Sequence, residues 1–324
     1  MSEQYDFFIS APTITIQDSI PRTERALSLA NDVVCSVSGG RDSDIMLDMV
    51  RRLDANGKVK YVFFDTGLEM LATKKHIAFL QEKYGIKIDT IKPKMSVAYA
   101  VRKHGYPFMS KIFAEFIGRL QTHGFKWEDR PFEELYKEYP NCKSALQWWC
   151  NCKKDGEHEY LQTEIGSRPF LKEFMMQNPP TFPISPKCCY FGKKEPSKRA
   201  SATADLVLIG LRKMEGGARA EKIKSCFVER NGKKTHYPCF WFDETDRKEY
   251  ERTYGVTNSD AYTVYGCKRT GCAGCPFSMN FESELKMLEQ YEPKMAKAVK
   301  NIFAPSYEYT RAYLKFRDEQ RKAS

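Results

Sequence analysis

The sequence predicts an α/β fold with a doubly wound parallel sheet, a helical insertion and a cysteine-containing C-terminal region. Residues 32–38, 59–64 and 86–91 are apolar runs of strand length. Residues 42–56 and 73–84 lie between these runs, have the apolar spacing of helices, and are each followed by a glycine. This alternation of strands and helices is typical of a parallel sheet covered by helices on both faces.

Composition and charge restrict the class of protein. The 324 residues carry 52 Lys and Arg against 42 Asp and Glu, and the net charge of +10 favours polyanionic partners. No apolar run is long enough to span a bilayer, and residues 1–20 lack the pattern of a secretory signal. We therefore expect a cytoplasmic protein without membrane association. In that compartment its 11 cysteines favour metal or redox chemistry over disulfides.

The first strand runs directly into the sequence Ser38-Gly39-Gly40-Arg41-Asp42-Ser43, and a helix follows. Glycines let a backbone approach phosphate oxygens, serine hydroxyls donate hydrogen bonds, and the N-terminus of a helix presents free N–H groups to an anion. The loop lacks the Gly-Lys-Ser/Thr ending of the commoner nucleoside-triphosphate loop. It predicts a phosphate site, and a tight turn without a ligand is the alternative.

The loop resembles the pyrophosphate loop of the adenine-nucleotide α-hydrolase superfamily, the PP-loop ATP pyrophosphatases. Residues 64–69, Phe-Asp-Thr-Gly-Leu-Glu, resemble a segment of its phosphoadenosine phosphosulfate (PAPS) reductase branch. Residues 210–215, with Arg219-Ala220, resemble that branch's Gly-Leu-Arg-Arg…Arg-Ala segment. The resemblance implies a Rossmann-like domain that binds ATP with Mg²⁺ and breaks the bond between the α- and β-phosphates.

The resemblance also implies the site residues. Asp65 and Arg212 follow predicted strands, at the edge of an open sheet where ligands bind, and guanidinium groups suit phosphate oxygens. The implied catalytic residues are Ser38, Asp42, Ser43, Asp65, Arg212 and Arg219. The implied nucleotide-binding residues are Ser36, Ser38, Gly39, Gly40, Arg41, Asp42, Ser43, Phe64, Asp65, Thr66, Gly67, Glu69, Gly210 and Arg212.

Seven of the cysteines form two groups, one of four residues and one of three. Cys188 and Cys189 are adjacent, and Cys272 and Cys275 form a Cys-x-x-Cys followed by proline. A Cys-x-x-Cys can hold zinc, an iron–sulfur cluster or a redox disulfide. The complete pattern resembles the four-cysteine set of assimilatory adenylyl-sulfate reductases, which implies a [4Fe–4S] cluster, with Cys267 as a rival ligand. A second group, Cys142, Cys150 and Cys152, is interpreted as core packing, unless Cys150 is a thiol that handles sulfur. A separate metal site, with His158 nearby, is the alternative for this group.

We therefore expect four regions. The first part of the nucleotide-binding domain is predicted at residues 1–105 and its completion at 188–224. A helical insertion is predicted at 106–187, and a cluster-binding and helical region at 225–324. The apolar run Leu206–Leu211 is expected to rejoin the sheet.

The first functional hypothesis follows from the resemblance of this chain to the DNA phosphorothioation ATP pyrophosphatases. It implies adenylation of a substrate oxygen for sulfur transfer, with nucleic acid as acceptor (DNA ahead of tRNA), a cysteine desulfurase as sulfur donor and other subunits of a modification system as partners. Candidate backbone contacts are Lys111, Arg119, Lys126, Lys153 and Lys154.

Three alternatives stay open. One is a sulfonucleotide reductase; that family uses a cysteine near its C-terminus, whereas no cysteine follows Cys275 here, so Cys150 or Cys239 would have to replace it. The others are a tRNA thiolation enzyme and a non-catalytic nucleotide-binding subunit.

Overall fold

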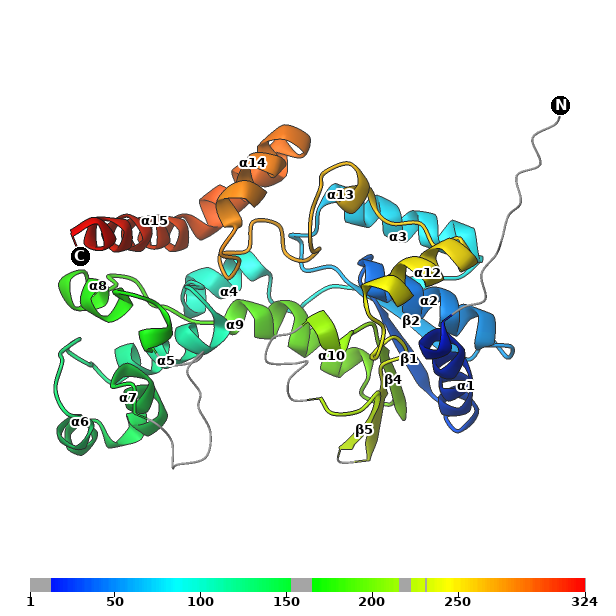
Figure 1. Cartoon of the computed structure of the whole chain (residues 1–324), viewed down its shortest axis with the longest axis horizontal. Helices are drawn as coiled ribbons and strands as arrows, with labels where there is room; N and C mark the ends of the chain where they lie inside the picture. The colour runs from blue at the N-terminus through cyan, green and yellow to red at the C-terminus, as the bar shows by residue number, and fades with distance from the viewer. Residues whose placement is uncertain (1–12, 153–164, 216–222, 231, 324) are drawn as a thin grey trace. The chain divides into compact units, whose positions relative to one another are not determined.

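The computed structural model describes residues 13–152, 165–215, 223–230 and 232–323. Its contacts divide the chain into two compact units (Figure 1). The sheet unit comprises Met1–Pro93 and Glu195–Gly271, and the helical unit comprises Lys94–Lys194 and Cys272–Ser324. Each unit therefore contains two separate stretches of the chain.

The sheet unit contains one six-stranded sheet in the order β3-β2-β1-β4-β6-β5. All neighbouring strands are parallel except β5 and β6, which are antiparallel. The α/β fold predicted from the sequence is thereby confirmed. The strands are β1 (Val33–Val37), β2 (Val59–Phe64), β3 (Ile88–Ile91), β4 (Leu206–Ile209), β5 (Phe227–Arg230) and β6 (Lys233–His236).

Helices cover both faces of this sheet (Figure 1). Alternate residues of β1 point to opposite faces: Val33, Cys35 and Val37 belong to a core shared with the helices α2 and α3. Val34 instead packs with Val62 on the other face, where α10 contacts β2. The helices of this unit are α1 (Ile14–Ser28), α2 (Arg41–Leu53), α3 (Leu71–Tyr84), α10 (Glu195–Ala200), α12 (Glu244–Tyr254) and α13 (Asp260–Thr263), with a short 3₁₀ turn η4 (Lys213–Glu215).

The strand order places the two predicted phosphate-site segments side by side. From β1 the chain continues outward through β2 and β3, and β4 then returns to the opposite side of β1. Ser36 of β1 pairs with Ile209 of β4, so both strands end at the same edge. In open α/β sheets, ligands bind outside the carboxyl ends of the strands where the order reverses. Residues 38–43 follow β1 at this point, and Gly210 follows β4.

The unit boundaries fall at 93/94, 194/195 and 271/272, whereas the sequence predicted 105/106, 187/188 and 224/225. Residues 227–236, expected in a separate C-terminal region, form β5 and β6 of the sheet. The alternation there is short and contains two lysines, so a propensity-based interpretation did not recognise these two strands. The first helix, α1, begins at Ile14, before the first strand.

The helical unit has an aromatic core. Trp148 and Trp149 are almost completely buried, together with Phe174 and Tyr313. The Trp149 indole N–H donates to the Glu128 carbonyl (2.9 Å), so its polar edge is satisfied inside the core. The helices are α4 (Val97–His104), α5 (Lys111–Thr122), α6 (Phe132–Glu138), α7 (Lys143–Trp149), α8 (Leu171–Gln177), α9 (Lys187–Cys189), α14 (Phe281–Tyr291) and α15 (Pro293–Ala323), with the short turns η1 (Pro140–Cys142), η2 (Ile165–Ser167) and η3 (Tyr190–Lys194).

Candidate functional site

The predicted phosphate loop is a close strand-to-helix turn. Gly39 has a φ of +65°, and a Cβ there would lie 3.1 Å from the methyl carbon of Thr73. Both the backbone angle and the packing therefore require glycine at this position. Helix α2 begins at Arg41, and no side chain caps its N-terminus. The backbone N–H groups of its first turn are thus oriented as in an anion site.

Hydroxyl groups surround the loop. The Ser43 hydroxyl accepts a hydrogen bond from the Ser38 amide (2.7 Å) and so closes the turn. A Cβ built on Gly40 would lie 3.0 Å from the Thr270 hydroxyl and 3.2 Å from the Tyr262 hydroxyl. The Ser38 hydroxyl is 3.3 Å from the same point. Three hydroxyl oxygens therefore converge above the Gly40 Cα, as the donors of an oxyanion site do.

Tyr262 and Thr270 were not recognised from the sequence. They follow β6 by more than twenty residues, in a segment without a motif that relates it to the loop. Their hydroxyls lie 3.1 Å apart, and the Arg41 guanidinium stacks 4.5 Å from the Tyr262 ring centre. The aromatic ring thus holds Arg41 beside the loop, although no sequence signal could have indicated the contact.

Gly210 lets the end of β4 pass against the start of α2. A Cβ on Gly210 would lie 2.7 Å from the Asp42 carbonyl oxygen and 2.7 Å from the Ser43 backbone nitrogen. Both contacts are to backbone atoms, which cannot move aside as a flexible side chain can. The structure therefore gives Gly210 a packing role, and its expected role in nucleotide binding stays a prediction.

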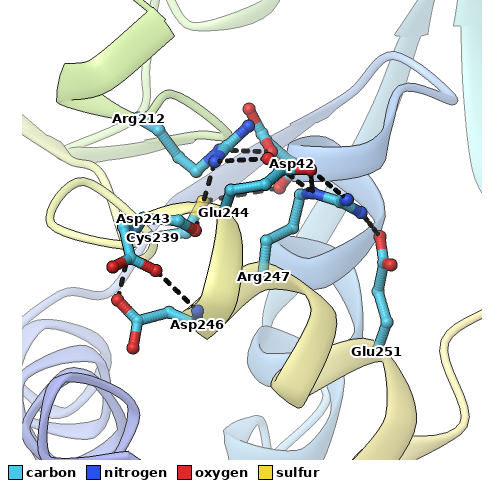
Figure 2. A network of polar contacts seen from close by, with 8 residues as sticks. All are labelled: Asp42, Arg212, Cys239, Asp243, Glu244, Asp246, Arg247 and Glu251. Carbon is cyan, nitrogen blue, oxygen red and sulfur yellow. Dashed lines mark hydrogen bonds and ion pairs between the residues drawn. The ribbon is translucent and has the colours of Figure 1, made fainter.

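Asp42 and Arg212 form a nearly buried ion pair beside the loop (Figure 2). Arg212 Nε donates to the Asp42 carboxylate (2.7 Å), and Arg212 Nη1 donates to the Asp243 carbonyl oxygen (3.2 Å) and to Glu244 (3.3 Å). Glu244 also pairs with Arg247, which lowers the pKa of Glu244 to about 2. The charge of Arg212 is thus shared among protein oxygens, and its expected contact with phosphate stays a prediction.

Glu215 adds a second carboxyl group near Asp42. Although the residue is exposed, partial burial of its carboxyl group raises the pKa of Glu215 to about 7, and a hydrogen bond with Asp42 acts in the same direction. Arg269 and Arg212 oppose this shift. Two carboxyl groups that share a proton are a common environment for a divalent cation, which replaces the proton. Glu215 lay within the quoted segment 210–215 but was not singled out.

The segment after β2 forms a compact turn around Asp65. The Asp65 carboxylate accepts hydrogen bonds from the Gly67 amide (2.9 Å) and from Lys74 (2.9 Å). Burial alone would raise the pKa of Asp65, but Lys74 and the Gly67 amide hold it below its usual range. The Thr66 hydroxyl donates to Glu69 (2.8 Å). This segment is well ordered by its own contacts, and its role in nucleotide binding stays a prediction.

Of three further expected site residues, the structure describes two. Ser36 lies within β1 and Phe64 ends β2, both half-buried. Arg219, expected to be catalytic, lies outside the described residues.

Cys188, Cys189, Cys272 and Cys275 all belong to the helical unit. Their thiols are close enough to interact electrostatically: the pKa of Cys188 is raised by its hydrogen bond with Cys189, by burial, and by Cys275 and Cys272. The pKa of Cys275 rises to about 12 because of burial and of Cys272. In number and donor type the four thiols fit an iron–sulfur cluster. Among the described residues, no group of three or more His, Cys, Asp or Glu is arranged to hold a metal ion.

The loop between Cys272 and Cys275 is held firmly. Gly274 has a φ of +59°, and a Cβ there would lie 2.8 Å from the Tyr307 hydroxyl and 2.9 Å from a Val299 methyl carbon. The Tyr307 hydroxyl also donates to the Gly274 carbonyl oxygen. The loop is therefore packed onto α15 at Gly274, between the two cysteines.

The other cysteines have different environments. Cys267, the rival ligand, belongs to the sheet unit, where its thiol is 3.9 Å from the Met70 sulfur. Cys142 is fully buried in the aromatic core. Cys150 is half-buried, and burial raises its pKa to about 11. Cys239 is fully buried, its pKa is raised by burial, and its thiol contacts the Asp42 carbonyl oxygen (3.5 Å). The thiols of Cys150 and Cys239 are thus poor nucleophiles at neutral pH.

In the described part of the chain, no helix is both long enough and apolar enough to cross a membrane. A search of the curated proteins found no match.

Solved structures similar to this chain share little sequence with it. One is phosphoadenylyl-sulfate (PAPS) reductase from Candida auris, in a phosphate complex, with 14% identity and a TM-score of 0.41 over 81% of this chain and 96% of that one. Another is the U34-tRNA thiolase NcsA from Methanococcus maripaludis with its [4Fe-4S] cluster, with 13% identity and a TM-score of 0.37 over 92% of this chain and 78% of that one. Residues 32–115, which contain the phosphate loop and the Asp65 turn, match the family model of the phosphoadenosine phosphosulfate reductase domain.

Proposed function

We propose that this chain is an ATP pyrophosphatase that adenylates a substrate oxygen for sulfur transfer, with the DNA backbone as the first candidate acceptor. The observation that carries the proposal is the phosphate loop. The uncapped N-terminus of α2 and three converging hydroxyls lie at the carboxyl ends of β1 and β4. A polyanion with several oxygens is the ligand that such an array of donors suits.

In the first step a substrate oxygen attacks the α-phosphorus of ATP, the bond to the bridging oxygen of the β-phosphate breaks, and pyrophosphate leaves with the bonding electrons. The backbone N–H groups of the α2 turn and the Ser38 hydroxyl would stabilise the charge on the departing group. Arg212 holds the Asp42 carboxylate in place through a hydrogen bond (2.7 Å). Mg²⁺, when bound, would neutralise phosphate charge, and Asp42 and Glu215 are the carboxylates that fit it.

In the second step, sulfur at the oxidation level of sulfide attacks the adenylated centre. A bond to sulfur forms as the bond to the AMP oxygen breaks, so AMP leaves and no electrons are transferred in this step. We propose that this sulfur comes from the persulfide of a cysteine desulfurase. A thiol attacks the inner sulfur of the persulfide, so that sulfide leaves and a disulfide forms; the thiol thereby supplies the two electrons of the reduction. Other subunits of a modification system are further proposed partners. Cys188, Cys189, Cys272 and Cys275 would hold a [4Fe–4S] cluster, whose iron can bind sulfur ligands.

The match to the reductase domain favours a second candidate, reduction of a sulfonucleotide. That chemistry needs a nucleophilic thiolate, and the pKa values of Cys150 and Cys239 are both raised by burial. A tRNA thiolation enzyme would use the same loop on a different acceptor. A nucleotide-binding subunit would retain the loop and release no pyrophosphate.

The deciding experiment is incubation of anaerobically purified protein with α-labelled ATP and Mg²⁺, with and without DNA. AMP and pyrophosphate, in amounts raised by DNA, support the proposal. Stimulation by tRNA alone would transfer it to the thiolation enzymes. Binding of the labelled nucleotide without AMP formation contradicts it, and sulfite release from an added sulfonucleotide and thiol would then support the reductase.

Variants of the loop sharpen the result. Asp42→Asn and Ser43→Ala should abolish AMP formation, because one removes the charge paired with Arg212 and the other opens the turn. Asp42→Asn is preferable to alanine because it keeps a hydrogen-bond acceptor for the nearly buried Arg212. Ser28→Ala, at an exposed serine of α1, is the matched control.

Iron content tests the cysteine set. Cys272→Ser should lose iron, whereas Cys267→Ser should retain it, because only Cys272 lies in the unit that contains Cys188 and Cys189. Loss of iron from Cys267→Ser alone would reverse the assignment.

A further inference from the structure

The helical unit contains a cavity of about 540 Å³ beside the cysteine group. That volume lies within the range of pockets that hold small organic ligands. Its walls come from the start of α5 and from the stretch that includes α9 and η3, and the Cys189 side chain forms part of one wall. The other lining residues are Lys111, Ile112, Glu115, Phe116, Pro186, Lys187, Tyr190, Phe191 and Lys194.

The charge of this cavity is positive. Lys111, Lys187 and Lys194 line it against a single acidic residue, Glu115. Within the described ranges of the chain, none of these three lysines forms an ion pair. Lysines without acidic partners are available to bind an anion that enters from solvent.

The structure distinguishes among the basic residues that the sequence offered as nucleic-acid contacts. Arg119 pairs with Glu115 (3.9 Å), and Lys126 pairs with Glu138 (3.5 Å). Lys153 and Lys154 lie outside the described residues. Of the five, Lys111 lines the cavity, and the structure adds Lys187 and Lys194 to it.

The cavity also offers an aromatic surface. The Tyr190 side chain is 41% exposed, and Ile112 is 36% exposed. The Tyr190 ring lies perpendicular to the Phe191 ring (5.1 Å between centres), and Phe191 stacks on His104 (5.0 Å). The Tyr190 ring therefore rests on a packed aromatic neighbour and is still partly exposed to solvent. Aromatic rings beside lysines are the combination with which proteins bind single-stranded nucleic acid, since bases stack on the rings and phosphates meet the lysines.

We propose that this cavity binds a single-stranded stretch of nucleic acid, with phosphates at Lys111, Lys187 and Lys194 and a base against Tyr190. The proposal rests on the proposed function, because it assigns the acceptor of sulfur a binding site. A duplex is excluded as the preferred ligand because its bases are stacked on one another and present no open face to Tyr190. DNA and RNA share the chemistry that the cavity recognises, and the experiment distinguishes them.

The test measures the anisotropy of fluorescent single-stranded DNA and RNA oligonucleotides titrated with the full-length protein, purified without oxygen, at several salt concentrations. Lys111→Ala and Lys194→Ala should each weaken binding and reduce the slope of log affinity against log salt by about 0.7. Tyr190→Ala should weaken binding about 5- to 100-fold, and Tyr190→Phe should retain it. Lys137→Ala, at an exposed lysine of α6 outside the cavity, is the matched control.

A wild-type protein that binds neither oligonucleotide, or prefers duplex, overturns the proposal, as does an unchanged slope in the Lys111→Ala/Lys194→Ala double variant. Displacement of the oligonucleotide by an acidic peptide of equal charge, with Tyr190→Ala without effect, would assign the cavity to a protein partner instead. These binding measurements contain no ATP. Failure of this inference is therefore separate from failure of adenylation, which the AMP assay measures.

Discussion

The two units of this chain hold reactive groups in different ways. In the sheet unit, charged groups near the phosphate loop satisfy one another: Asp42 pairs with Arg212, and Glu244 links Arg212 to Arg247. In the helical unit, the lysines of the basic cavity form no ion pairs among the described residues, and an aromatic core supports the surrounding helices. The charged groups of the sheet unit are thus compensated within the protein, whereas the three lysines of the cavity have no acidic partner among the described residues.

The sheet unit depends on close backbone approach, and Gly210→Ala should have the largest effect on the site. The new methyl group would lie 2.7 Å from backbone atoms of Asp42 and Ser43, so the start of α2 must move. We expect AMP formation to fall on the order of 100-fold or more, because small displacements of a catalytic loop have effects of that size.

The matched control is Gly85→Ala, which has a similar need for glycine without the close contact. Gly85 has a φ of +59°, and nothing lies within 4 Å of its Cβ position. It should lose about 1 kcal/mol of stability and keep its activity. Equal activity in the two variants would contradict the packing role of Gly210.

The helical unit depends on its aromatic core, and Trp149→Ala tests that dependence. Trp149 is fully buried and packs against Phe125 and Trp127. Its removal should lower the free energy of unfolding by about 3–5 kcal/mol. Hydrogen exchange measured by mass spectrometry should show faster exchange in α5 and α7 and little change in β1 and β2. Equal acceleration in both units would show that they unfold together, and the comparison between them would fail.

The sequence predicted the features of these units that depend on local patterns. It did not predict the contacts between residues that are far apart along the chain. The loop, α2 and β1 depend on local patterns, and residues 38–43 lie at the sheet edge as predicted. Arg212 was also placed at the correct edge, although its contacts with Asp42 and Glu244 could not be predicted. These contacts join residues more than thirty positions apart, and no local spacing encodes them. Tyr262 and Thr270 reach the loop through the same kind of long-range folding.

The cysteines show the same limit. The pairs Cys188-Cys189 and Cys272-x-x-Cys275 are visible as motifs, and the structure places both in one unit. No feature of the sequence separates Cys267 from these pairs, because it lies only five residues before Cys272. Its contact with Met70 depends on where the chain crosses from one unit to the other.

A buried histidine tests how the sheet unit tolerates charge. His236 bonds the Thr23 hydroxyl (3.0 Å) and the Cys226 carbonyl oxygen (3.0 Å), and burial lowers its pKa to about 4. The folded state therefore favours the neutral ring. The contribution of the neutral His236 ring to the free energy of unfolding should be fully present above pH 6.5. It should fall as the pH drops towards 4, because His236 in the unfolded chain takes up the proton first. The loss should approach about 3 kcal/mol.

Chemical denaturation of the wild type and of His236→Gln at pH 7 and pH 4.5 measures this effect. The glutamine variant should lose less stability between the two pH values, since its side chain does not titrate. An identical loss in both proteins would show that other groups, such as the buried carboxyls, dominate acid unfolding.

The smallest expected effect concerns the hydroxyls above Gly40, and it decides whether the site is only a backbone cradle. Tyr262→Phe removes one hydroxyl and keeps the ring that stacks on Arg41 (4.5 Å). If the hydroxyl contacts the leaving phosphates, AMP formation should fall about tenfold, the value of one neutral hydrogen bond. Tyr99→Phe, at an exposed tyrosine of α4, controls for the loss of a phenol elsewhere. An unchanged rate in Tyr262→Phe would leave the backbone of α2 as the principal donor, whereas a loss would show that residues outside the loop motif complete the site.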